Sequence, residues 1–391
     1  MQRTTSTAGT VLRAVLEHGP ASRSAVARTT GLSAASVSRQ AADLVRAGLL
    51  RELPEVSGPN GLGRPHVPLE LDTERHVVAG VHVAVGHATS VVMDLRGRIL
   101  ATHSEPHRGA GPEAVLRRAG GTVRALLDTH ADGAAPLGIG FASGGWVDPD
   151  TGTVIEHELL GWRRVPVANL LSEATGLPVH IDGHSRALVH AEQLFGEARG
   201  SACVVLFVGN VVDTAFATDG VVHYGRRSAA GGVAHLPVAG SDYPCSCGRR
   251  GCLQASVSEW AMVGRALRRG IIDSPSFPAL LAAARDGDTA ALRMFRTRAE
   301  LVGRAAAMLF DVLNPEVLVV VEQGISNLPG CMEVLRAEVR SRSTACERPE
   351  ETVLPTSFPD TVLAIAAGAV LLDVLYTDPL GPVRRRFAPA M

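Results

Sequence analysis

The stretch Cys245-Ser-Cys247-Gly-Arg-Arg-Gly-Cys252 places three cysteines close together, and His235 precedes it in Ala-His-Leu-Pro. Three thiolates and one imidazole form the ligand set of a closed tetrahedral zinc site. The two glycines of the run allow the tight turns that return Cys252 to the first two cysteines. We therefore predict that His235, Cys245, Cys247 and Cys252 bind zinc. The alternatives are buried free cysteines or a disulfide, and His235 is the best placed of 14 histidines.

The same run carries a family resemblance. Gly-Gly-Val-Ala-His235, followed by Cys-x-Cys-Gly-x-x-Gly-Cys-Leu, resembles the signature of the ROK family, which contains repressors, open reading frames and sugar kinases. The resemblance extends over about residues 76 to 375. It implies an actin-like fold of two α/β lobes, with a sugar pocket and an ATP site in the cleft. Whether the chain keeps those two sites decides its function.

Composition and charge favour a protein with more than one domain and a nucleic-acid partner. The 391 residues are 46% hydrophobic and 20% charged, as in ordinary globular proteins. No apolar run approaches the roughly 20 residues of a membrane span, and the N-terminus lacks a signal-peptide core. We therefore expect no membrane partner. A thiolate zinc site suits a reducing compartment, so we also expect a cytoplasmic protein. Residues 1–70 hold eight arginines and five acidic residues, whereas the whole chain has a net charge of −1.

Residues 1–73 are predicted to form a winged helix-turn-helix domain, ahead of an actin-like ROK-type domain over residues 76–391. An apolar stripe at helical spacing begins at Val11 and stops before Gly19-Pro20. Ser22 can cap a second helix over residues 23–30, and Ser33 can cap a third. The short turn between the second and third helices matches a helix-turn-helix. The stretches 49–52 and 67–71, with a Gly-rich loop between them, read as two strands and a wing.

The exposed side of the third helix carries small hydroxyl residues together with Arg39 and Gln40. In the major groove Arg can pair with guanine and Gln with adenine, and Arg64 in the wing could enter the minor groove. The alternative is a helical bundle for docking or dimerisation, with both arginines solvated. The predicted DNA contacts are Ser22, Arg23, Ser33, Ser36, Ser38, Arg39, Gln40 and Arg64.

Both phosphate-binding loops that the resemblance to the family's kinases implies are altered in this sequence. The resemblance implies Asp-x-Gly-Gly-Thr after the first strand, but here His82 stands at the Asp position and Ala84-Val85 replace the glycines. A Cβ there obstructs close approach of the backbone to phosphate. The second loop reads Gly209-Asn-Val-Val-Asp213, which puts a negative charge where nucleotide phosphates would lie. These losses argue against ATP binding.

The resemblance also implies a catalytic Asp, and this position holds His184, with Arg186 at the family's second Asn. Asp182 lies two residues away, so a shifted base is the remaining possibility. Without phosphate loops a base has no phosphoryl group to transfer, and we predict that the chain is not an enzyme.

The family's sugar pocket is altered as well. Glu158 stands for an Asn that holds sugar hydroxyls, while Gly232 and Gln254 replace two glutamates. Two interpretations remain: a different effector, such as a charged or modified sugar or another small polar metabolite, or no effector. The predicted effector pocket consists of Glu158, His184, Arg186, Gly232, His235 and Gln254.

The remaining chain indicates helices over residues 163–175, 256–270, 276–286, 290–313 and 361–377, with a strand over 318–321. Together these features predict a DNA-binding transcription regulator, and more specifically a repressor. A single winged helix contacts few base pairs, so we expect a homodimer or homotetramer on a palindromic or repeated operator in double-stranded DNA. The alternatives are a ROK-type sugar kinase with a regulatory DNA-binding domain, and a scaffold that docks a protein through residues 1–70.

Overall fold

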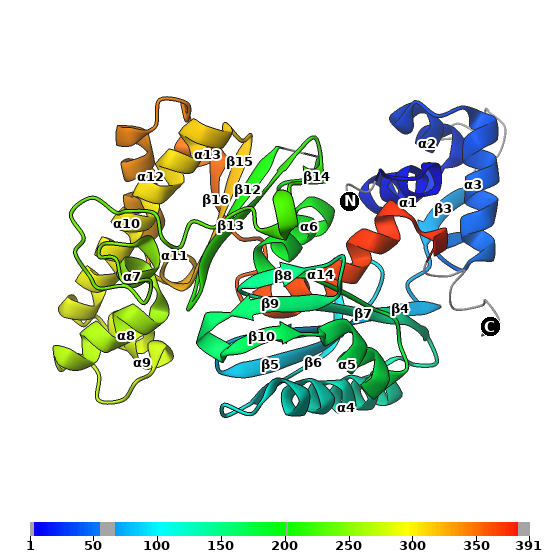
Figure 1. The fold of residues 1–391 in the computed structure, drawn as a ribbon. Coiled ribbons are helices and arrows are strands. Elements are labelled where there is room, and N and C mark those ends of the chain that lie inside the picture. The colour runs from blue at the N-terminus through cyan, green and yellow to red at the C-terminus, as the bar shows by residue number, and fades with distance from the viewer. Residues whose placement is uncertain (1–3, 55–66, 201, 382–391) are drawn as a thin grey trace. The chain divides into compact units, whose positions relative to one another are not determined.

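The computed structural model describes residues 4–54, 67–200 and 202–381, which divide into two compact units (Figure 1). The first unit is Met1–Ser143, Val147–His184 and Leu363–Met391, and the second is Gly144–Trp146 and Ser185–Val362. Among the described helices, none is both long and apolar enough to cross a membrane.

The first unit begins with three helices and a small sheet. Their bounds are α1 (Thr7–His18), β1 (Ala21–Ser22), α2 (Arg23–Thr30), α3 (Ala34–Arg46), β2 (Leu50–Glu52) and β3 (Pro68–Leu71). The strands pair antiparallel in the order β1-β3-β2. The apolar positions of the three helices are buried together, with Leu12, Val37 and Leu44 fully enclosed. The predicted winged helix-turn-helix is confirmed in its helices and in the two strands that lead into the wing.

A five-stranded sheet forms the body of the first unit, in the order β11-β7-β4-β5-β6. β4 pairs antiparallel with β5 and parallel with β7. Helices α4 and α5 pack against this sheet and against each other. A smaller sheet has the order β10-β9-β8. The bounds are β4 (His76–Val83), β5 (His87–Met93), β6 (Ile99–Pro106), α4 (Pro112–His130), β7 (Ala135–Ser143), β8 (Trp146–Asp148), β9 (Thr153–His157), η1 (Glu158–Leu160), β10 (Trp162–Val165), α5 (Val167–Thr175) and β11 (Val179–Gly183).

Helix α14 (Val362–Thr377) lies directly on this sheet. A Cβ added at Gly140 of β7 would lie 2.1 Å from the carbonyl oxygen of Ala367, and one added at Gly80 of β4 would lie 2.7 Å from the amide nitrogen of Gly368. Only glycine allows helix and strand backbones to approach this closely. Most of α14 is buried and apolar on every side, as expected of a helix inside a core.

The second unit repeats the strand arrangement of the first. Its sheet has the order β14-β13-β12-β15-β16, in which β12 pairs antiparallel with β13 and parallel with β15. The expected pair of α/β lobes is thereby confirmed. Helices α10 and α12 pack closely together, and the core includes Phe295, Phe310 and Val320. The bounds are α6 (His184–Phe195), β12 (Cys203–Val208), β13 (Val212–Thr218), β14 (Val221–Val222), η2 (Arg226–Ser228), α7 (Leu253–Val257), α8 (Glu259–Arg268), α9 (Phe277–Arg285), α10 (Thr289–Leu313), β15 (Val317–Glu322), α11 (Gln323–Asn327), α12 (Cys331–Arg342), α13 (Pro349–Thr352) and β16 (Val353–Pro355).

Two helix predictions differ from the structure. Residues 163–165 belong to strand β10, because Trp162 pairs with His157 across an antiparallel ladder, and the helix begins only after Pro166. The predicted helix over residues 256–270 is two helices, α7 and α8. Ser258 separates them in an extended conformation, and its side chain accepts a hydrogen bond from the amide of Ala261, which caps α8.

Candidate DNA-binding and metal sites

The third helix, α3, has the form of a recognition helix. Ser33 precedes it in an extended conformation, and its hydroxyl oxygen accepts a hydrogen bond from the amide of Ser36 at 3.2 Å. Val37 and Leu44 are buried against the other helices, whereas Ser38 and Arg39 are exposed and Gln40 is half-buried. In the described ranges no ion pair involves Arg39. Its guanidinium is therefore available to an external partner.

The second helix, α2, presents a more constrained N-terminus. The hydroxyl of Ser22 accepts a hydrogen bond from the amide of Ala25, and Gly31 ends the helix in the left-handed conformation. Arg23, predicted to contact DNA, forms an ion pair with Glu52 of β2. Arg28 on the same helix is exposed, and no ion pair with it occurs in the described parts of the chain. Nothing local in the sequence distinguishes Arg28 from an ordinary surface arginine.

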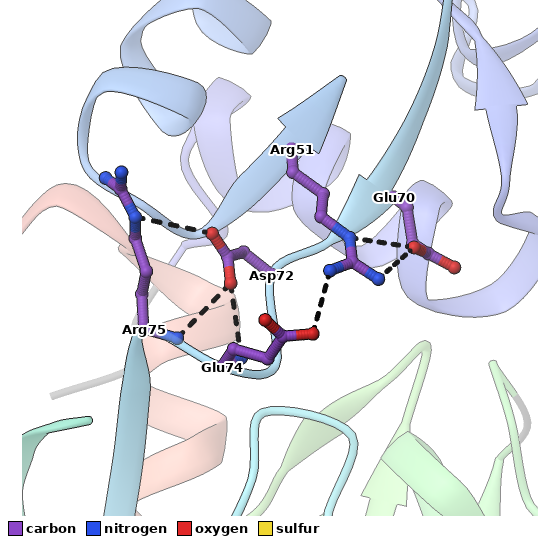
Figure 2. Close-up of polar contacts among 5 residues, drawn as sticks. All are labelled: Arg51, Glu70, Asp72, Glu74 and Arg75. Carbon is purple, nitrogen blue, oxygen red and sulfur yellow. Dashed lines mark hydrogen bonds and ion pairs between the residues drawn. The ribbon is translucent and has the colours of Figure 1, made fainter. Parts of the chain in front are cut away.

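Polar contacts join the wing strands to the segment that leads into β4 (Figure 2). Arg51 of β2 lies opposite Glu70 of β3, and its guanidinium binds Glu70 at 2.8 Å and Glu74 at 3.0 Å. These hydrogen bonds raise the pKa of Arg51, and the bond with Glu70 has the larger effect. Asp72 accepts hydrogen bonds from the amides of Glu74 and Arg75, both at 3.2 Å. The connection is thus an ordered turn. Arg64, the predicted wing contact, lies outside the described residues.

Helix α1 contacts the end of α14 (Figure 1). The amide of Ser6 donates to the carbonyl of Thr377 at 2.9 Å. Arg13 donates to the carbonyl of Tyr376 at 3.3 Å and forms an ion pair with Asp373 at 3.2 Å. The last carbonyls of a helix have no partner within it, and a cation is favoured there. The winged helix therefore completes the C-terminus of α14.

The four predicted metal ligands meet in the second unit. The ligand atoms of His235, Cys245, Cys247 and Cys252 all lie within 4.8 Å of one another. Nδ1 of His235 is 3.6 Å from Sγ of Cys245, and Sγ of Cys247 is 3.6 Å from Sγ of Cys252. A tetrahedron with Zn–S bonds of about 2.3 Å has sulfur–sulfur separations of about 3.8 Å. The cluster has the donors and the spacing to hold a metal ion.

Two ligands of this cluster differ in their surroundings. Cys247 is exposed, and Nε of Arg249 lies 3.5 Å from its sulfur, which lowers the pKa of Cys247 to about 6. Burial raises the pKa of Cys252 to about 11. The other three cysteines, Cys203, Cys331 and Cys346, are buried free thiols.

The six residues of the predicted effector pocket are divided between the units. Glu158, exposed in η1, and His184, buried at the start of α6, belong to the first unit. The other four residues belong to the second, where Arg186 donates to the carbonyl of Ser228 at 3.2 Å and Gln254 accepts from the amide of Val212 at 3.3 Å. Neither unit by itself contains all six: Glu158, His184, Arg186, Gly232, His235 and Gln254.

His82 occupies the end of β4, where family kinases carry a carboxylate. Its side chain is 2% exposed, and within the described residues neither ring nitrogen has a hydrogen-bond partner. The ring stacks on His184 with centroids 5.8 Å apart. Burial, followed by the charge of His184, lowers the pKa of His82 well below its usual value, so the ring is neutral. A buried neutral imidazole does not hold a magnesium ion as a carboxylate would.

The fold and these sites define a winged-helix protein with a two-lobed, actin-like body. A model of the ROK family matches residues 78–372, and a model of the MarR family matches residues 4–57. The chain therefore belongs to the ROK family.

Relatives of known name share almost the whole chain. A transcriptional regulator of Mycobacterium tuberculosis is 35% identical over 97% of this chain and 88% of its own length. The DNA-binding transcriptional repressor Mlc of Escherichia coli is 24% identical over 95% and 94%, and the xylose repressor of Bacillus subtilis is 22% identical over 93% and 94%.

Solved structures support the same fold. A ROK family transcriptional regulator described as a homolog of the E. coli MLC protein superposes with a TM-score of 0.78 at 22% identity, covering 96% of this chain and 98% of its own. A ROK family glucokinase from Streptomyces griseus has a TM-score of 0.65 at 23% identity and covers 75% of this chain and 98% of its own. With its N-terminal winged helix, the chain has the domain organisation of the regulator branch.

Proposed function

We propose that this protein is a transcriptional repressor that binds operator DNA through its winged helix. The observation that carries the proposal is the capped, exposed helix α3 at the start of a ROK chain. Relatives over nearly the full length are named transcriptional regulators or repressors, including the M. tuberculosis and E. coli proteins. Docking, dimerisation or scaffolding alone would not need a polar recognition face.

The DNA contacts divide into two groups. Ser38, Arg39 and Gln40 are proposed to reach base edges, because their side chains lie on the outer side of α3 beyond its first turn. Residues at the N-termini of α2 and α3 would contact phosphates, where helix N–H groups attract anions. Arg23 would do so while held in place by Glu52. The phosphate group comprises Ser22, Arg23, Ser33 and Ser36, and Arg64 is proposed for the minor groove.

The test compares two arginines of one helix. We expect Arg39→Ala to weaken binding to a specific operator by about 1–3 kcal/mol, roughly 5- to 150-fold, and to relax the base preference at one position. Arg46→Ala is the control, because Arg46 lies near the end of α3 and pairs with Asp43 at 2.8 Å. Operators are first selected by pulldown from genomic DNA and then measured by gel shift at fixed salt. Absence of binding to any fragment at low salt, or equal behaviour of the two variants, would contradict the proposal.

We also propose that the protein binds its operator as a homodimer or homotetramer. One winged helix covers too few base pairs for typical specific affinity, so two half-sites are required. Light scattering of the protein–DNA complex and footprinting of the operator test this point. A monomer that protects a single half-site at full affinity would refute it.

We propose that the chain does not phosphorylate sugars, although structural neighbours include kinases. Support comes from the contacts at the altered positions. His82 is neutral and buried, and Asp213 accepts a hydrogen bond from Ser185. Arg186 binds the carbonyl of Ser228 and stacks on Tyr224 at 5.0 Å. Calorimetry with ATP tests the alternative of a kinase with a regulatory domain, since binding at micromolar nucleotide would favour it. The six-residue effector pocket stays a prediction, with a regulator that has no effector as the alternative.

We propose that the metal is zinc and that it is structural. Sulfur-rich donor sets with one imidazole favour zinc, and four protein ligands leave no open position for a catalytic water. When bound, the ion would fix the loop from His235 to Cys252, because its binding energy becomes folding energy.

Metal analysis and melting test this assignment. We expect about one zinc per native chain and its loss in Cys247→Ser, with a melting temperature lower by about 5 °C or more. Cys346→Ser serves as the control, because Cys346 is a buried thiol outside the cluster. A native protein with well under one zinc per chain, or a Cys247→Ser variant that melts like its parent, would refute the proposal.

A further inference from the structure

The second unit contains a cavity that the predicted functions do not use. Its volume is about 400 Å³, within the range of small-molecule sites. Its walls come from α7, from α8 and the residues after it, from α10, and from the loop that carries the cysteines. The cavity includes none of the six predicted effector residues. Any ligand here would therefore occupy a separate site.

Among the described residues that line the cavity, four are arginines and none is Asp or Glu. One of them, Arg298, is fully buried and balanced by Glu322, with nitrogen and oxygen 2.5 Å apart. For Arg265, Arg269 and Arg293, the described part of the chain provides no ion pair with a carboxylate. Arg269 and Arg293 are exposed, whereas Arg265 is half-buried. The cavity thus has an excess of positive charge. Two of its arginines are open to solvent and one lies deeper.

Arg265 is fixed in position before any ligand arrives. Its guanidinium donates to the carbonyls of Ala255 at 3.2 Å and Ser256 at 2.6 Å, and lies 4.5 Å from the ring centroid of Tyr243. Burial lowers the pKa of Arg265, and the charges of Arg269 and Arg298 lower it further. Like charges held close together are a cost that a bound anion would offset.

The chemistry of the walls narrows the class of anion. A phosphate monoester carries close to two negative charges at neutral pH and offers three acceptor oxygens, which suits several planar guanidinium groups. Ile271, Met294 and Leu301 add apolar wall, so an organic remainder can be buried beside the charged group. A concave site of this volume does not accommodate a nucleic-acid backbone, which follows an open surface.

We propose that this cavity binds a small phosphorylated metabolite through Arg265, Arg269 and Arg293. Because Tyr243 belongs to the loop between His235 and Cys245, a ligand here would contact the same loop that the metal holds.

The test uses ribose 5-phosphate as the probe, with ribose and citrate as comparisons, by calorimetry of the full chain at constant ionic strength. Ribose 5-phosphate should bind, ribose should not, and citrate should bind at least tenfold more weakly. Arg269→Gln and Arg293→Gln should each weaken binding about tenfold, since each removes a charge-assisted hydrogen bond. Arg296→Gln is the matched control, because Arg296 is an exposed arginine of α10 outside the cavity.

Both cavity variants substitute exposed residues, and unchanged melting without ligand will show that they fold. The proposal is overturned by absence of binding at millimolar ribose 5-phosphate, by equal binding of citrate, or by full affinity in the Arg269→Gln/Arg293→Gln double variant. Arg265→Gln is a further variant, which should abolish binding. DNA binding by these variants in the absence of ligand should match the parent, since none lies in the winged helix.

Discussion

Gly9 is the residue on which the contact between the winged helix and α14 depends. A Cβ added at Gly9 would lie 2.6 Å from the carbonyl oxygens of both Tyr376 and Thr377. These are backbone atoms of a buried helix, so they cannot move aside as the end of a flexible side chain can. We therefore predict that Gly9→Ala displaces α1 from α14. The displacement would also lengthen the hydrogen bonds that Ser6 and Arg13 make to the same carbonyls.

The magnitude follows from two opposing effects. Overpacking by one methyl group costs about 1–3 kcal/mol. Replacing a helical glycine by alanine returns up to about 1 kcal/mol. Because the added methyl group meets two fixed carbonyl oxygens, we place the overpacking cost in the upper part of its range. The net loss is then about 1–2 kcal/mol, which raises the population of the locally open state roughly five- to thirtyfold.

Hydrogen exchange of the full chain measures this opening. Peptides over residues 7–18 and the end of α14 should exchange faster in Gly9→Ala, whereas the α3 peptide should keep most of its protection. The control is Gly121→Ala, also a helical glycine, because no atom of the described residues outside its own helix turn lies within 4 Å of its added Cβ. Affinity for two joined half-sites should fall more than affinity for one, since undocking loosens the spacing of two winged helices. Exchange in Gly9→Ala equal to the parent would refute the reasoning.

Two further substitutions test buried charge. Glu322→Gln should destabilise the second unit by about 3–5 kcal/mol, because it leaves Arg298 buried without its charged partner. Urea unfolding measures this loss. The control is Glu156→Gln, which removes one partner of an exposed ion pair and should change stability by less than about 1 kcal/mol. His82 has a lowered native pKa, so below about pH 6.5 the unfolded chain binds a proton that the native chain lacks, and stability falls as the pH falls. His82→Met should reduce the loss of melting temperature between pH 7.5 and pH 5, although His87, whose pKa is also lowered, will retain part of it. An acid loss identical to the parent's would exclude His82 as its source.

The parts of the fold that could be predicted are those with local physical signals. Ser22 and Ser33 cap helices because a hydroxyl one residue before a helix can accept from its first free amides. Gly31 ends α2 because its φ of 70° is unfavourable for other residues. The cysteine cluster was predictable for a similar reason, since a short run with two turns forces its thiols together. In each case the partners lie within a few residues of one another or within one loop.

Features made by distant segments gave no such signal. Arg298 and Glu322 form a buried pair across two elements, and each looks in the sequence like a surface residue. The ion pair between Arg23, the first residue of α2, and Glu52 of strand β2 likewise joins residues 29 positions apart, and no local pattern indicates it. The cavity arginines come from α8, from the residue that follows it and from α10, and these segments line one cavity only in the folded unit. Pairing between segments depends on the packing of both, which no local pattern contains.

Three glycines within helices and strands of the first unit all lie against one helix, α14. In the sequence Gly9, Gly80 and Gly140 weaken the helix and strands that contain them. In the structure an added Cβ at each would meet backbone atoms of α14. Since α14 is apolar on every side, it cannot present a different face to water without exposing buried surface. A shift of α14 along the sheet must therefore move Tyr376 and Thr377 relative to α1. The position of the recognition helix is set by the same helix that fills the core of the first unit.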